Sequence, residues 1–154
     1  MNVSGEIIVK APRAAVFDRL RDAPFFASCV EGVRDLQAVD ERHYTAVMET
    51  RVAYMKFTFK VAVELVKAVP PDLIEARIEG APLGIVGRLN ATSQTTLSEA
   101  GDETHIKYTV EVSLTGKLGS LGAPVLKAKA REMEKQFGAN LQRAFEPAPA
   151  GAAS

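Results

Sequence analysis

The chain contains few of the residues that usually carry metal or redox chemistry. Among its 154 residues there are one cysteine, two histidines and no tryptophan. The single Cys29 cannot form an intrachain disulfide, and no pair of histidines or cysteines has a spacing typical of metal ligands. No secretory leader pattern precedes the first strand-like run. We therefore predict a cytoplasmic protein without a disulfide framework or a metal site.

The sequence also lacks an excess of charge and a long apolar run. Lysine plus arginine and aspartate plus glutamate both number 19, so the overall charge does not favour nucleic acid as a partner. No run reaches the roughly 18 apolar residues that a membrane-spanning helix needs. With 47% apolar residues, the chain has the composition of a globular domain.

Side chains suited to nucleophilic or acid–base catalysis are sparse as well. His43 follows a charged turn, and His105 occupies a polar position of an alternating segment, so we interpret both as surface residues. Cys29 lies between Phe26 and Val30, where a thiol usually behaves as a small buried hydrophobe. We therefore predict no catalytic residue.

An alternation of apolar and polar residues runs from Val33 to Gly116 and predicts six strands in an antiparallel meander. Its clearest part is the segment 57–65, in which every second residue is apolar, so one face of the sheet is expected to be buried. A further strand is predicted over residues 2–10. Two short helices should follow it before the meander begins, the first of them after Pro12.

The last part of the chain has the pattern of a long amphipathic helix. Its apolar residues recur at spacings of three to five, a stripe that would cover the apolar face of the sheet. They are Val125, Ala130, Met133, Phe137, Leu141 and Phe145. Residues 147–154 contain no large apolar side chain, so we predict a single domain over residues 1–146 and a disordered Pro/Ala tail over 147–154.

Several short motifs give the chain a family resemblance. They are Gly5, Ala11-Pro12, Val16-Phe17, Glu31-Gly32, Pro70-Pro71 and Gly116-Lys-Leu-Gly. Together with the order of elements they resemble the family of the carbon monoxide dehydrogenase G subunit, within the START-like (SRPBCC) superfamily. The family usually carries tryptophan at the position of Phe17, proline at Glu31 and glycine near Ala53.

The resemblance implies an α+β helix-grip fold, also called START-like or Bet v 1-like. In this fold a curved seven-stranded antiparallel sheet wraps around a long C-terminal helix, with two short helices between the first two strands. It also implies non-enzymatic binding of an apolar small molecule, a quinone or a lipid, between sheet and helix, with no covalently bound cofactor. The partner that it implies is a molybdenum hydroxylase of the carbon monoxide dehydrogenase type, which the protein would serve in maturation, membrane recruitment or electron delivery.

The glycine-rich segment 116–124 precedes the long helix. Its spacing matches neither of the common phosphate-binding glycine patterns, so we interpret Gly116, Gly119, Gly122 and Pro124 as a hinge. Two interpretations of the segment remain open, a bent start of the helix or an apolar lip beside the ligand cavity. Lys117 within it, and Lys127 just after it, could meet lipid head groups in a peripheral membrane contact.

Small side chains among large ones on the apolar strand positions indicate a cavity. The residues that we expect to line it are Phe59, Ala76, Ile85, Gly87, Ala91, Tyr108, Val110, Leu118, Leu121, Val125, Met133 and Phe137. The polar residues that we expect to orient an oxygen-bearing ligand are Tyr54, Ser93 and Thr95, together with Tyr108.

Two alternatives to a carrier remain at this point. One is a cyclase-like or hydratase-like enzyme of the same fold, for which Tyr108 and Glu49 are the candidate acid–base residues. The other is an interaction module whose groove receives an apolar segment of a protein partner.

Overall fold

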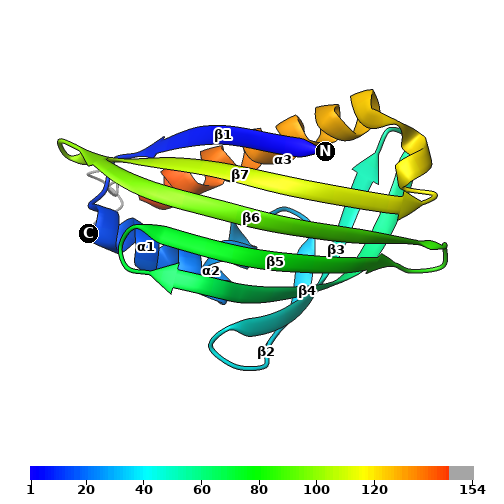
Figure 1. The fold of residues 1–154 in the computed structure, drawn as a ribbon, viewed down its shortest axis with the longest axis horizontal. Helices are drawn as coiled ribbons and strands as arrows, with labels where there is room; N and C mark the ends of the chain where they lie inside the picture. Colours follow the sequence, from blue (N-terminus) through cyan, green and yellow to red (C-terminus); the bar gives the residue numbers. More distant parts are fainter. Residues whose placement is uncertain (146–154) are drawn as a thin grey trace, which may run out of the picture.

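A curved antiparallel sheet and a long helix dominate the computed structural model, which describes residues 1–145 (Figure 1). The elements are β1 (Asn2–Val9), α1 (Arg13–Arg21), α2 (Ala23–Ser28), β2 (Val33–Ala38), β3 (His43–Val52), β4 (Met55–Val69), β5 (Leu73–Pro82), β6 (Gly87–Ala100), β7 (Glu103–Gly116), the short 3₁₀ helix η1 (Gly119–Leu121) and α3 (Ala123–Ala144). The sheet order is β1-β7-β6-β5-β4-β3-β2, with seven strands. The predicted helix-grip fold is therefore confirmed. The tail predicted over 147–154 lies outside the described residues.

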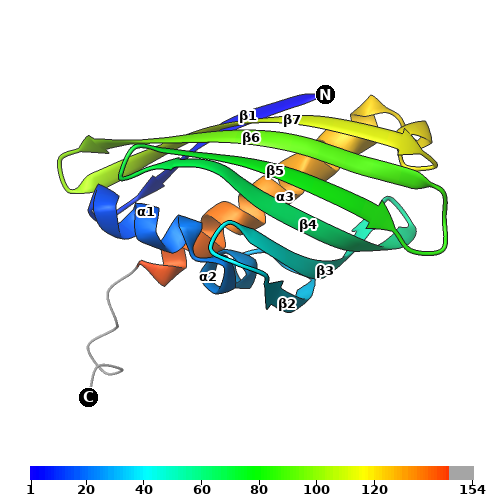
Figure 2. The same ribbon diagram turned by 60° about the horizontal axis from the view of Figure 1, so that its bottom comes forward.

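Helix α3 runs across the concave face of the sheet (Figure 2). Its C-terminal half is held by side-chain hydrogen bonds to main-chain carbonyl groups: Asn140 Nδ2 donates to the carbonyl of Cys29 and Gln142 Nε2 to that of Ile8, each at 3.0 Å. Between them Leu141 is fully buried. This end of the helix is thus fixed to β1 and to the end of α2.

The buried apolar residues form two separate clusters. The main core joins β1, α1 and α3 and contains Phe17 and Leu141, neither of which is accessible to solvent. The second cluster contains Val52, Phe57, Phe59 and Leu118, which come from β3, β4 and the β7–α3 connection. Inward strand positions that belong to neither cluster, together with the edge of the main core, are therefore available to line a cavity.

One turn signal in the sequence does not end a strand. Gly80-Ala-Pro82 contains residues typical of turns, but β5 continues to Pro82 and the connection to β6 follows it. The pairing of β5 with β6 ends at Gly80, while Pro82 still pairs with Phe59 of β4. Because the last residues of β5 have a neighbour on one side only, a proline without an N–H group is tolerated there.

We expect Ala53→Gly to stabilise the protein. Ala53 begins the two-residue β3–β4 turn with φ 57°, in the left-handed region. A Cβ atom costs about 1–2 kcal/mol there, and the greater freedom of glycine in the unfolded chain offsets part of the gain. The free energy of unfolding, measured with urea, should rise by up to about 1 kcal/mol.

The control for this turn is Ala128→Gly, at an exposed position of α3. It should lower the free energy of unfolding by about 1 kcal/mol, because helical backbone penalises glycine. A loss of similar size at position 53 would contradict the left-handed turn.

Candidate ligand-binding site

A cavity of about 610 Å³ lies between the sheet and α3. Its walls come from the inner face of β4 to β7, from α2 and from the helix. They include Phe26, Val63, Ile74, Ala76, Ile78, Ser93, Thr95, Ile106, Tyr108, Val110, Ala130, Met133 and Phe137. Most of this lining is apolar, and the volume falls within the range of about 300–1,000 Å³ typical of small-molecule sites.

A row of short side chains explains why this part of the interior is not filled. Ala76 pairs with Ser93, which in turn pairs with Val110 on the next strand. On the opposite wall, α3 presents Ala130. Since cores of folded proteins are normally close-packed, small residues that face each other across two layers leave space for a ligand.

Tyr108 supplies a polar group inside this apolar space. Its ring lies over Gly5 of β1, where a Cβ atom would overlap with the Tyr108 hydroxyl and with Oε1 of Glu134 on α3. The hydroxyl is buried and makes no well-formed hydrogen bond within residues 1–145, although the Glu134 carboxylate lies beside it. Burial, together with the adjacent Glu134 carboxylate, raises the pKa of Tyr108. At neutral pH the phenol therefore keeps its proton and can donate a hydrogen bond to a ligand oxygen.

The rim of the cavity is charged. The exposed charged residues of the lining are Glu31, in the loop after α2, Arg51 of β3 and Glu132 of α3. Lys129, whose side chain is only 16% exposed, points its Nζ to Glu132 at 3.4 Å. The opening thus lies between α3 on one side and the α2–β2 loop with β3 on the other.

Several residues predicted to line the cavity do lie on its wall. These are Ala76, Tyr108, Val110, Met133 and Phe137, with the polar Ser93 and Thr95. Glu134 also lines the cavity and was not among the predicted residues, although it follows Ala130 by four residues. Its helical spacing places it at the edge of the apolar stripe, which is the signal that could have identified it.

Other predicted lining residues lie elsewhere. Phe59, Ile85, Leu118, Leu121 and Val125 belong to the second cluster, because the curved end of β4 meets the β7–α3 connection there. Leu118 is only 2% exposed and no residue of the segment lines the cavity beneath α3, so the segment does not form an apolar lip beside that cavity. The glycine segment instead forms a bent start of α3, with η1 between the left-handed Gly116 (φ 68°) and Gly122 (φ 91°), and with Pro124 in the first turn of the helix.

Four further predicted residues also lie outside the cavity or face away from it. Tyr54 is 89% exposed at the β3–β4 turn. Gly87 pairs with Gly116 at the end of the sheet. The carboxylate of Glu49 pairs with Arg34 and with Lys56, which lowers the pKa of Glu49, mainly through the hydrogen bond from Arg34. Glu49 borders the cavity, but strand alternation puts its side chain on the outer face, where its carboxylate pairs with Arg34 and Lys56.

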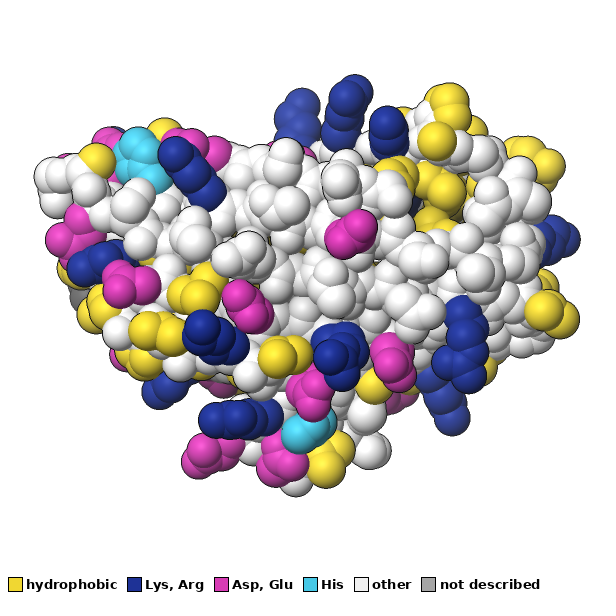
Figure 3. All heavy atoms as spheres, in the orientation of Figure 1, with side chains coloured by type: hydrophobic (Ala, Val, Ile, Leu, Met, Phe, Trp, Pro, Cys, Tyr) yellow, Lys and Arg dark blue, Asp and Glu magenta, His cyan; other side chains and the backbone are white. Residues whose placement is uncertain are grey.

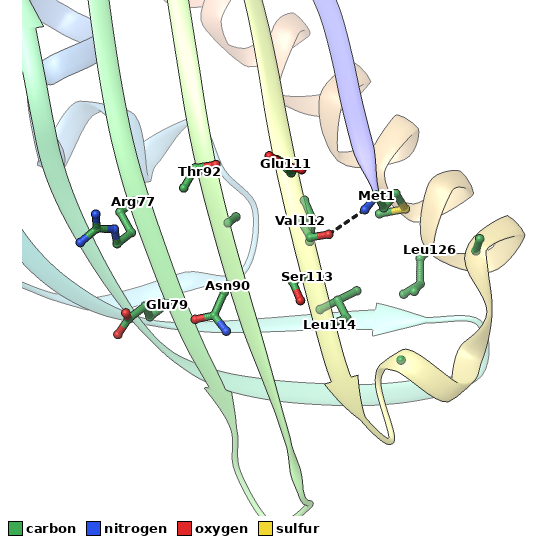
Figure 4. A pocket seen from close by; sticks show the side chains of 13 residues that line it. Met1, Arg77, Glu79, Asn90, Thr92, Glu111, Val112, Ser113, Leu114 and Leu126 are labelled. Carbon is green, nitrogen blue, oxygen red and sulfur yellow. Dashed lines mark hydrogen bonds between the residues drawn. The ribbon is translucent and has the colours of Figure 1, made fainter.

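Ala91, the fourth of these residues, borders a second and more open depression of about 680 Å³. This depression lies where the sheet edge at Met1 meets β7, whose Val112 carbonyl accepts a hydrogen bond from the Met1 amino group at 2.9 Å. Its polar side chains stand on separate strands and do not converge on one point (Figure 4). We therefore take the cavity beneath α3 as the site.

The histidines and the cysteine do not form a reactive cluster. His43 lies on the surface between Asp40 and Glu64, whose carboxylates raise the pKa of His43. Burial raises the pKa of the Cys29 thiol, which lines the cavity in its neutral form. Among residues 1–145 there is no cluster of His, Cys, Asp or Glu that could hold a metal ion, and no helix there is long and apolar enough to cross a membrane.

Solved structures with the same fold cover nearly the whole chain. A conserved protein from Geobacillus kaustophilus aligns with a TM-score of 0.86 and 23% identity, over 94% of this chain and 95% of that one. A START superfamily protein from Mycobacterium smegmatis gives 0.69 and 13%, over 94% and 96%. The Zhui aromatase/cyclase from Streptomyces sp. R1128 gives 0.68 and 13%, over 94% and 93%.

These structural similarities show the START-like, helix-grip fold. None of the curated proteins compared with the chain matches it. The family model for CoxG, the G subunit of carbon monoxide dehydrogenase, however, matches residues 5–146, which include Gly5 and the strands and helix that wall the cavity. The chain therefore belongs to the CoxG family.

Proposed function

We propose that the protein binds one apolar small molecule, a quinone or another lipid-like compound, and carries it without chemical change. The observation that supports this most strongly is the cavity of about 610 Å³ with its mainly apolar wall. Burying an apolar molecule there removes about 25 cal/mol of unfavourable hydration for every Å² of apolar surface. A ligand of drug size would therefore gain several kcal/mol from burial alone.

The Tyr108 hydroxyl would orient the ligand. It is a buried donor that makes no well-formed hydrogen bond inside residues 1–145, although the Glu134 carboxylate lies beside it, and an unpaired buried polar group costs about 1–3 kcal/mol. A ligand carbonyl oxygen within hydrogen-bond distance would remove this cost. The neighbouring Glu134 carboxylate repels an anionic head group, which favours a neutral oxygen acceptor such as a quinone carbonyl or an ester.

Membership of the family suggests the protein that this carrier serves. We propose a molybdenum hydroxylase of the carbon monoxide dehydrogenase type, which the carrier would assist in maturation, membrane recruitment or electron delivery. A quinone in the cavity suits electron delivery, because quinones are mobile, apolar electron acceptors.

A second candidate function is catalysis on a ligand in the same cavity. It is favoured by the proximity of a protonated phenol and a carboxylate, Tyr108 and Glu134, which are groups that can move protons. Aromatase/cyclases are among the proteins with this fold. An enzyme would convert its ligand and lose turnover in Tyr108→Phe, whereas a carrier returns the molecule unchanged.

Native mass spectrometry of the purified protein, combined with organic extraction, tests the carrier proposal. We expect a mass excess equal to one small molecule per chain, which disappears on denaturation. The extract should contain that molecule with a neutral oxygen group. Ligand-free protein that also fails to bind added quinones and lipids would overturn the proposal.

Tyr108→Phe should weaken binding of an oxygen-bearing ligand about three- to tenfold, the value of one neutral hydrogen bond. Binding of a hydrocarbon analogue of the same shape should not change. The matched control is Tyr54→Phe at the exposed β3–β4 turn, which should leave both affinities unaltered. Equal losses for both ligands would show that the hydroxyl does not contact the ligand oxygen.

A further inference from the structure

Three connections lie side by side at one end of the molecule, which we call the loop end. It comprises the β3–β4 turn with its flanks (51–56), the β5–β6 connection (83–88) and the β7–α3 connection (116–127). The Lys117 amide donates to the carbonyl of Val86 at 3.2 Å, and inward residues of all three connections pack in the second cluster. Both ribbon views show the three segments together at the right end (Figures 1 and 2).

Large apolar side chains project from the loop end into solvent. Tyr54 is 89% exposed, Val86 is 86% exposed and Leu83 is 52% exposed. Tyr54 lies on the β3–β4 turn, and Leu83 and Val86 lie on the β5–β6 connection. Neighbouring residues of both connections pack in the second cluster. The folded chain thus holds these apolar side chains outward although none of them contributes to a core.

The charged residues of the loop end are all basic. The three segments contain Arg51, Lys56, Arg88, Lys117 and Lys127 and no aspartate or glutamate, so their local net charge is +5. Within residues 1–145, only Lys56 among them has an ion-pair partner, Glu49 at 3.5 Å. The rest of the chain carries 14 basic against 19 acidic residues, so the basic charge is concentrated here. The right end of the face in Figure 3 shows hydrophobic and basic side chains together.

We propose that the loop end docks on a bilayer of anionic phospholipids. Tyrosine and aliphatic side chains on protruding turns can enter the interfacial layer, while lysines and arginines around them contact lipid phosphates. The charge is complementary to such a surface, and three separate turns can insert into a fluid layer without a preformed groove. This proposal does not depend on what the cavity holds. Arg51 belongs both to the loop end and to the cavity rim, so docking would bring the opening close to the membrane.

The absence of tryptophan from the sequence makes a direct test possible. Tyr54→Trp places a single fluorescent reporter on the loop end, and Val39→Trp places one on the β2–β3 turn, where Val39 is 68% exposed. We expect vesicles of phosphatidylcholine mixed with phosphatidylglycerol to shift the emission of the first variant to shorter wavelength. Neither vesicles of phosphatidylcholine alone nor the second variant should show the shift.

Vesicle co-sedimentation of otherwise unchanged protein measures the contribution of each part. Val86→Glu should reduce binding to the anionic vesicles about tenfold or more, and the control Val39→Glu should leave it unchanged. The double variant Arg88→Gln, Lys117→Gln should reduce binding about 25-fold, from about fivefold for each cation. Thermal melts of these variants should match the wild type, because all four side chains are exposed.

Three results would overturn the proposal. The first is no binding of the wild type to anionic vesicles, and the second is an equal loss in Val39→Glu and Val86→Glu. The third is a concentration-dependent dimer that Val86→Glu dissociates, without vesicle binding, which would identify a second copy as the occupant. Since Val86→Glu leaves the cavity intact, its co-purified ligand should remain, so failure of docking and failure of the carrier proposal give different results.

Discussion

Ala76→Phe should abolish retention of the co-purified ligand. Ala76 faces α3 from the middle of β5, in the row of short side chains that keeps the cavity open. A phenyl ring at this position occupies the space that the ligand needs, and it buries apolar surface that an empty cavity leaves without contacts. Native mass spectrometry should show ligand-free protein, while the free energy of unfolding stays the same or rises by about 1 kcal/mol.

The same substitution on the opposite face of the sheet provides the control. Ala62 lies on the neighbouring strand β4 and is exposed, so Ala62→Phe should leave the ligand in place. Wild-type ligand content in Ala76→Phe would place the ligand outside the cavity. Ligand loss with a large drop in stability would instead show that the space is already filled by the protein.

Leu141→Ala is expected to cause a large loss of stability. Leu141 is 0% exposed and packs in the main core, from the part of α3 that Asn140 and Gln142 fix to α2 and β1. Truncating a buried leucine removes its burial and leaves a void, which together cost about 3–4 kcal/mol. The midpoint of thermal unfolding should fall by about 10 °C, since each kcal/mol shifts a domain of this size by a few degrees.

Leu83→Ala, on the exposed β5–β6 connection, is the matched control and should change stability by less than about 1 kcal/mol. Calorimetry or urea denaturation measures both variants. Similar small losses of stability in the two variants would mean that α3 is not anchored through Leu141 and that other contacts hold this helix over the cavity.

Local patterns in the chain were enough to predict the elements and their order. The alternation over residues 57–65 and the helical stripe that includes Met133 and Leu141 are periodic, and they predict a strand and a helix whatever lies around them. The motifs around Gly5 and Gly116 indicated the family, and the match of the family model to residues 5–146 confirms it. These features were predictable because each depends on residues close together in the chain.

Which inward residues meet the ligand space depends instead on how the helix packs on the curved sheet. Phe59 and Val63 lie on the same face of β4, yet Val63 lines the cavity while Phe59 is packed in the second cluster. The curvature of the sheet and the path of α3 separate them, and periodicity carries no information on either. Tyr108 and Glu134 come together over Gly5, and the loop end gathers its basic residues from three connections, because strand pairing brings distant segments into contact. Alternation assigns a residue to a face, but only the packing of helix on sheet decides which of those residues surround an open space.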